Sequence, residues 1–260
     1  MEENDKNAIR IVVIKYSEDK SEWPQKILEH FSQTYEYIIE NSLRSYSIYH
    51  YMKLSIGSNS KVTRDYYDLT LIHLRKLFEK PMKNAFNETE IVKIRDYQIS
   101  FCTWINDFVA TFSKIDLSND IWYENNVHFI KKNINASIKV LKEFIKIYSY
   151  NDINIDGFNT YHPLKTRIIE YASKFVAHNI RADRIEEWEY SDEIFVKDCE
   201  LENLSSILLN ILIKYRNLMY YWNNVVKMPE FDYNISLEDY MKNCYHTYLE
   251  DINGICKLDM

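Results

Sequence analysis

The chain has 260 residues, of which 46% are hydrophobic and 27% are charged, and its formal net charge at pH 7 is −7. This charge is not typical of a protein that binds nucleic acid over its whole surface, although a local basic face is compatible with it. Only three glycines and four prolines are present. Because all-β and doubly wound folds need glycine in turns and phosphate-binding loops, the composition predicts an all-α helical bundle.

The start of the chain is acidic and has no apolar segment of the kind found in signal peptides. The longest apolar runs are far shorter than the roughly 18 residues of a membrane-spanning helix. We therefore expect a cytoplasmic protein that does not contact a membrane. The four cysteines form no CxxC pair, so we expect reduced thiols, with no metal site and no cofactor.

A strand-like segment lies near the start of the chain, at Asn7 to Tyr16, where β-branched residues follow one another. A single strand cannot satisfy its own backbone hydrogen bonds, so it needs a partner. The best candidate partner is Glu193 to Asp198. The sequence therefore predicts at most a minor two-stranded β element beside the helices.

Amphipathic helices follow in succession, because apolar residues recur every three or four positions. This periodicity predicts helices at about 23–53, 62–79, 87–112, 118–148, 163–181 and 199–226. Ser236 to Asp239 matches a capping box at the start of a last helix. No repeat or linker separates these segments, so we expect one domain over 1–260. Its parts would be a strand-like segment at 1–20, a helical bundle at 22–228 and a C-terminal helix at 235–256.

The predicted helix at 118–148 carries the most basic face of the chain, formed by Lys132, Lys139, Lys142 and Lys146. Lysines on the outer face of a helix are most often simply solvated. The same arrangement can also bind phosphate groups, since phosphate binding requires clustered cations. The sequence leaves both interpretations open.

The predicted helix at 163–181 reads PLKTRIIEYASKFVAHNIR and carries a histidine that does not fit its pattern. Its apolar stripe consists of Leu164, Ile168, Tyr171 and Phe175. His178 continues this stripe, so an imidazole that titrates near neutral pH stands where packing alone would favour leucine. One interpretation is a packed histidine with a satisfied hydrogen bond, and the other is a group that transfers protons.

The segment Ser173 to Asn179, SKFVAHN, resembles the Arg-(Asn/Asp)-Lys-x-x-Ala-His stretch of the HEPN superfamily, specifically its abortive-infection branch. Tyr66 to Lys80 is similar to the helix that precedes this stretch in that branch, and Asp198 to Tyr215 resembles the helix that follows it. The resemblance covers roughly Tyr66 to Trp222. It implies a HEPN-like helical fold, a role in a bacterial or phage-defence system, and, in catalytic members, metal-independent RNA cleavage in the cleft of a homodimer.

This chain departs from the catalytic members of the family in one respect. They carry an arginine five to seven residues before the histidine, and the residues at these positions here are Tyr171, Ala172 and Ser173. Arg167 is eleven residues from the histidine, which is roughly 16 Å along a helix. The resemblance then implies a site in which His178 transfers a proton, Lys174 or Arg181 supplies the cation, and Asn179 donates a hydrogen bond to phosphate.

The missing arginine favours a non-catalytic or weakly active homodimer that binds RNA or a protein partner, with Tyr171, Lys174 and His178 at the interface. The alternative is a metal-independent HEPN ribonuclease, acting in toxin or abortive-infection systems, in which His178 is catalytic. A third hypothesis is that His178 only packs and that the function lies elsewhere on the surface. The sequence does not decide whether the protein is an enzyme.

Overall fold

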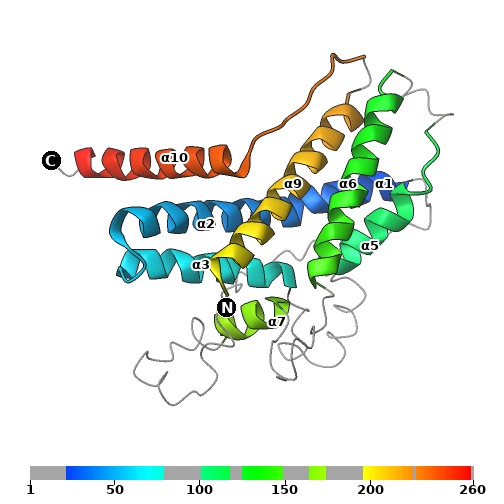
Figure 1. Cartoon of the computed structure of the whole chain (residues 1–260). Helices are drawn as coiled ribbons and strands as arrows, with labels where there is room; N and C mark the ends of the chain where they lie inside the picture. The colour runs from blue at the N-terminus through cyan, green and yellow to red at the C-terminus, as the bar shows by residue number, and fades with distance from the viewer. Residues whose placement is uncertain are drawn as a thin grey trace, which may run out of the picture.

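The computed structural model describes residues 22–78, 101–117, 125–148, 164–173, 196–224 and 227–258. All regular structure within these ranges is helical, which confirms the all-α fold class (Figure 1). The expected strand at Asn7 to Tyr16 lies outside the described residues. At the other expected strand, Asp198 already begins a helix, because the Glu200 carboxylate accepts a hydrogen bond from the Lys197 backbone N–H and caps that helix (2.9 Å).

The first part of the bundle is a continuous helical segment made of α1 (Trp23–His30), the π turn η2 (Phe31–Tyr35) and α2 (Glu36–Ile56). Pro24 stands in the first turn of α1, where a missing backbone N–H costs nothing. At the other end, α2 stops at Gly57, whose φ of 87° lies in the region that favours glycine. The predicted helix at about 23–53 is therefore confirmed, with a π turn inside it.

The helix α3 (Lys61–Phe78) returns antiparallel to α2 and forms a hairpin with it (Figure 1). The Ser60 hydroxyl accepts a hydrogen bond from the Thr63 backbone N–H at 3.1 Å, which caps the start of α3. The Thr63 hydroxyl donates to the Gly57 carbonyl oxygen at 2.9 Å. These side-chain bonds close the turn between the two helices, close to where the sequence predicts it.

The other helices that the structure describes are α5 (Phe101–Phe112), α6 (Val127–Tyr148), α7 (Leu164–Tyr171), α9 (Asp198–Trp222) and α10 (Leu237–Leu258). α6 packs along α9, and α7 lies beside α3 (Figure 1). α6 begins at Val127, later than predicted, because residues 125 and 126 form a turn in which the buried Asn126 side chain donates to the Asn224 carbonyl oxygen (2.6 Å). Among the described residues, no helix is both long and apolar enough to cross a membrane.

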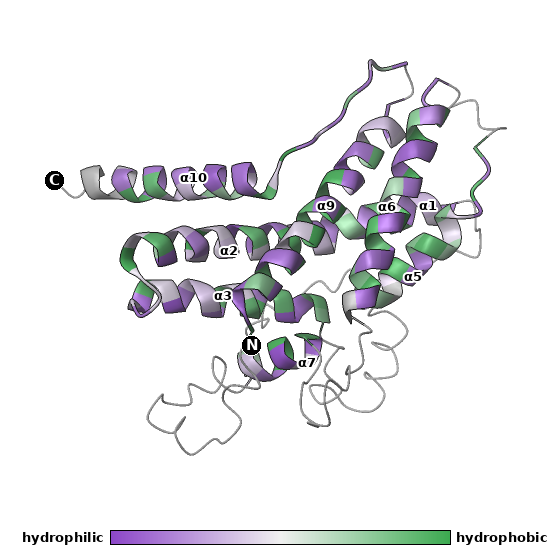
Figure 2. Ribbon diagram, in the orientation of Figure 1, coloured by the Kyte–Doolittle hydropathy of each residue, from purple (hydrophilic) through white to green (hydrophobic). Residues whose placement is uncertain are grey.

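Aromatic side chains from several elements meet in the core. The Phe31 ring lies 4.0 Å from the Tyr215 ring and 4.8 Å from the Trp104 ring, measured between centroids. Trp104 Nε1 donates to the Ile27 carbonyl oxygen at 2.9 Å, and the Tyr215 hydroxyl donates to the Leu28 carbonyl oxygen at 2.6 Å. The end of α1, directly before the π turn, is thereby fastened to α5 and α9. Figure 2 shows the hydrophobic residues concentrated where α5, α6 and α9 meet.

The last helix, α10, runs alongside α2 and is joined to α9 by an extended segment, residues 227–236, which we call the strap (Figure 1). The Ser236 hydroxyl accepts a hydrogen bond from the Asp239 backbone N–H at 3.0 Å and donates to the Asp239 carboxylate at 2.6 Å. These bonds confirm Ser236 as the N-cap of this predicted helix. Among the described side chains of α10, Met241 is the one that is fully buried, and Leu237 and Tyr240 pack against the core while partly buried.

Candidate functional site

The four residues that the sequence singles out for chemistry, Lys174, His178, Asn179 and Arg181, lie outside the described residues. The structure does describe the part of their helix that precedes them, up to Ser173. This part includes the three positions at which catalytic HEPN proteins place their arginine. It therefore shows what surrounds those positions in this chain.

Arg167 on α7 is buried, with 6% of its surface exposed, and its guanidinium forms a two-bond ion pair with Glu200 on α9. Nη1 donates to Glu200 Oε2 at 2.9 Å, and Nη2 donates to Oε1. The same carboxylate accepts the Lys197 backbone N–H that caps α9. Glu200 thus fixes the first turn of α9 and also binds the arginine of α7. The two parallel bonds to the carboxylate need the planar fork of a guanidinium, which lysine does not have.

The electrostatics of Glu200 show which effect dominates at this ion pair. Burial alone would raise the pKa of the carboxyl group, but the hydrogen bonds from Arg167 and the Lys197 backbone outweigh burial and hold that pKa below its ordinary value. Glu200 is therefore ionised at neutral pH and keeps the guanidinium in place. Arg167 is committed to this contact and does not present a fork to a phosphate group.

A second polar contact joins α7 to α3. The Tyr171 hydroxyl donates to Asp68 Oδ1 at 3.0 Å, and the Tyr171 ring packs edge-on against the Tyr67 ring at 5.5 Å. The Tyr67 hydroxyl donates to the Val196 carbonyl oxygen at 2.9 Å and accepts from its N–H at 3.2 Å. Tyr171 is thus engaged within its own chain, and Ala172, the next of the three positions, is 1% exposed.

The titration of the Asp68–Tyr171 pair follows from its burial. Burial raises the pKa of the Asp68 carboxyl group, and the hydrogen bond from Tyr171 moderates this increase. Burial and the nearby Asp68 charge also raise the pKa of the Tyr171 phenol. Chemically, the contacts of Arg167 and Tyr171 hold α7 against α9 and α3. The sequence does not identify the two acidic partners, Asp68 and Glu200. Glu200, for example, has the pattern of an ordinary acidic residue in a first helical turn.

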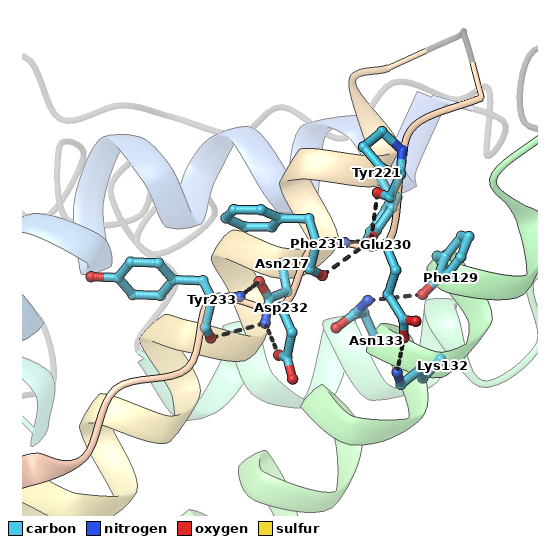
Figure 3. A network of polar contacts seen from close by, with 10 residues as sticks. Phe129, Lys132, Asn133, Asn217, Tyr221, Glu230, Phe231, Asp232 and Tyr233 are labelled. Carbon is cyan, nitrogen blue, oxygen red and sulfur yellow. Dashed lines mark hydrogen bonds and ion pairs between the residues drawn. The ribbon is translucent and has the colours of Figure 1, made fainter.

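Another network of polar contacts holds the strap against α9 (Figure 3). Asn217 accepts from the Tyr233 backbone N–H at 2.9 Å and donates to its carbonyl oxygen at 3.2 Å. The Tyr221 hydroxyl accepts from the Phe231 backbone N–H and donates to its carbonyl oxygen at 3.0 Å. On the opposite side, Glu230 points to Lys132 on α6 and pairs with it at 3.0 Å. Side chains of α9 thus satisfy the backbone N–H and carbonyl groups of Phe231 and Tyr233, which have no neighbouring strand to pair with among the described residues.

The strap and α9 enclose a shallow groove of about 400 Å³ between them. Tyr220 and Phe231 stack on each other within it, with ring centroids 4.3 Å apart. Arg216 at its edge is paired with Glu36 at 2.9 Å and with Glu40. The groove therefore has an apolar wall whose rings are already in mutual contact and one cation that two carboxylates neutralise.

The described residues contain no group of three or more His, Cys, Asp or Glu side chains that could hold a metal ion. No protein-family model matches the chain, and neither a curated protein nor a solved structure matches it. The contacts of α7 and the charges on the helix surfaces are therefore the observations from which a function can be argued.

Proposed function

We propose that this chain is a HEPN-like protein of a bacterial or phage-defence system that binds RNA as a homodimer and cleaves it weakly or not at all. The segment Ser173 to Asn179 motivates the family. The observation that carries the proposal is the buried ion pair between Arg167 and Glu200. It supports weak or absent cleavage, because the arginine of α7 is bonded to a carboxylate of its own chain and does not bind a phosphate group.

The physical reason lies in what metal-independent RNA cleavage requires. An imidazole must take the proton of the 2′-hydroxyl, and a cation must stabilise the charge that develops on the phosphate. The positions that carry the cation in catalytic relatives are here a tyrosine bonded to Asp68, a buried alanine and a serine. Lys174 or Arg181 would have to replace it. A lysine is a point charge and does not bind phosphate in a two-bond fork, so cleavage would be slow.

We expect the purified protein to bind a labelled single-stranded RNA and to leave it intact over the time in which a HEPN ribonuclease degrades it. Fluorescence anisotropy measures the binding, and gel electrophoresis measures the cleavage. Any residual cleavage should persist in a metal chelator and disappear in His178→Ala, since loss of a proton-transfer group costs about 10²–10⁴-fold. Lys174→Ala should lose part of the rate.

Two results would contradict this assignment. Strong cleavage that is lost in His178→Ala would establish the ribonuclease alternative and show that Lys174 or Arg181 replaces the missing arginine. Robust metal-independent cleavage that survives His178→Ala would remove His178 from the site. Circular dichroism of each variant must match the wild type, because a histidine on an apolar stripe also packs.

We further expect a homodimer, with Tyr171, Lys174 and His178 in its interface. Closed two-fold pairing places the same patch of both copies face to face, so one site is completed by two chains. Sedimentation at micromolar concentration should give twice the chain mass. A monomer at tens of micromolar would remove the cleft that the proposal needs.

A further inference from the structure

The outer face of α6 carries a row of lysines with one asparagine among them. Successive residues of a helix turn by about 100°, so six positions of α6 fall within an arc of about 100° along roughly 22 Å of helix. Five of them are lysines and one is an asparagine: Lys131, Lys132, Asn135, Lys139, Lys142 and Lys146. All six are exposed. We call this row the α6 stripe.

The structure separates one lysine of the α6 stripe from the others. Lys132 pairs with Glu230 of the strap at 3.0 Å, which neutralises it and raises its pKa. The other four lysines form no ion pair with any described residue. Glu143 at the border of the arc is the nearest acidic residue on this helix. A chain with a formal charge of −7 thus keeps a cluster of lysines on one surface that no described carboxylate neutralises.

The opposite face of α6 makes this stripe rigid. Ile130, Ile134, Leu141 and Phe144 are buried against the bundle, and the Phe129 ring stacks on the Tyr221 ring of α9 at 4.8 Å. A helix seated in this way holds its outer charges at fixed spacing. When a polyanion binds along them, the backbone needs no ordering, and the entropy cost is confined to the lysine side chains.

The chemistry of the face favours phosphate over a protein partner. Protein interfaces centre on buried aromatic or aliphatic anchors and are poor in lysine. The exposed large apolar side chains that the structure describes lie on α2, α3, α10 and the strap, and none lies on α6 between Val127 and Lys146. A surface with lysines and an amide but no apolar anchor suits a phosphodiester backbone, where point charges track the strand without reading its sequence.

We propose that the α6 stripe is the surface along which single-stranded RNA binds through its phosphates. This inference rests on the proposed RNA binding and adds where and how the strand is held. The phosphates are contacted by four lysines, Lys131, Lys139, Lys142 and Lys146, and by Asn135, which donates a hydrogen bond to a phosphate oxygen. Lys132 does not take part, because it is paired with Glu230. Binding is independent of base sequence and sensitive to salt.

Anisotropy titrations of a labelled oligouridylate over a range of salt concentrations test the proposal. The double variant Lys139→Gln/Lys142→Gln is expected to bind about tenfold or more weakly at low salt. Its plot of log affinity against log salt should be less steep by about 1.4, since each phosphate contact on a single strand contributes about 0.7 to the slope. The control Lys61→Gln/Lys242→Gln makes the same charge change at exposed positions on α3 and α10 and should bind like the wild type.

The ion pair of Lys132 offers a second test with the opposite sign. Glu230→Gln releases Lys132 into the α6 stripe, so binding should become tighter and the slope steeper by about 0.7. Asp251→Asn is the matched control, because it removes a carboxylate from another exposed ion pair, with Arg44 at 3.2 Å, away from α6 (Figure 1). This variant should leave both the affinity and the slope unchanged.

The outcomes distinguish the two proposals. Wild-type affinity in the Lys139→Gln/Lys142→Gln variant, or equal losses in it and in its control, would overturn the α6 stripe and leave RNA binding standing. A wild-type protein that does not bind the oligouridylate at any salt concentration would overturn both. Polyglutamate that competes as well as the RNA, with the same dependence on the two lysines, would assign the stripe to an acidic polypeptide instead.

Discussion

Arg167→Ala is expected to lower the free energy of unfolding by about 3 kcal/mol, measured by urea denaturation at pH 7. The substitution leaves the Glu200 carboxylate partly buried without the guanidinium that holds it, and uncompensated buried charges are among the costliest defects in a folded protein. It also weakens the first turn of α9, because Glu200 accepts the Lys197 N–H there. The contact between α7 and α9 should loosen first.

A double-mutant cycle with Glu200→Ala separates the pair from the loss of packing, since the two side chains are in direct contact. The exposed pair of Lys132 and Glu230, with side chains 56% and 63% exposed, is the matched control. Lys132→Ala should change stability far less than Arg167→Ala does, because water and salt screen an exposed ion pair. If Arg167→Ala costs no more than Lys132→Ala, the buried ion pair does not hold α7 in the bundle.

The second large effect concerns His30, whose buried ring nitrogens have no hydrogen-bond partner among the residues that the structure describes. Its ring packs edge-on against Tyr35, 5.3 Å away, and burial lowers its pKa to about 4. The unfolded chain, with an ordinary value near 6.5, therefore binds the proton more tightly. Stability from this group is complete above pH 6.5 and is lost as the pH falls toward 4, by about 3 kcal/mol in total.

Urea denaturation at several pH values between 4 and 7 measures this loss. His30→Leu should flatten the slope in that range, because leucine carries no proton and leaves no buried nitrogen without a partner. The exposed His246 serves as the control, and His246→Gln should retain the wild-type slope. An equal slope in wild type and His30→Leu would show that other groups cause the pH dependence. Glu200 contributes in a separate window, since its lowered pKa matters only below about pH 4.5.

The elements that the sequence predicts best are those whose signals are local. The helices α3 and α9 carry long apolar stripes, and Ser236 with Asp239 forms the predicted cap of α10. The π turn η2 was not predicted. It coincides with hydrogen bonds from Trp104 and Tyr215 to the end of α1, which join residues 77 and 187 positions apart. The periodicity of a helix does not indicate contacts between residues so far apart in the sequence.

In the candidate site, too, the sequence predicts the local features and not the long-range contacts. The sequence placed Tyr171 on an apolar stripe, and the structure shows that its hydroxyl also serves Asp68, 103 positions away. The distance of Arg167 from His178 along the helix excludes Arg167 from the predicted site. The structure adds that Glu200 binds it. No motif joins an arginine in one helix to the first turn of another. The roles of Lys174, His178, Asn179 and Arg181 stay predictions.

The attachment of α10 determines which part of the folded chain should unfold locally first. The strap is fastened to α9 by the side chains of Asn217 and Tyr221, while α10 fully buries only Met241 among its described side chains and packs Leu237 and Tyr240 partly buried against the bundle. Detaching α10 therefore exposes less apolar surface than unfolding the bundle does, and α10 should open in a subglobal step of lower free energy while the bundle stays folded. Its amide hydrogens should exchange with solvent long before those of α9. The strap is then the boundary between two cooperative units of one chain.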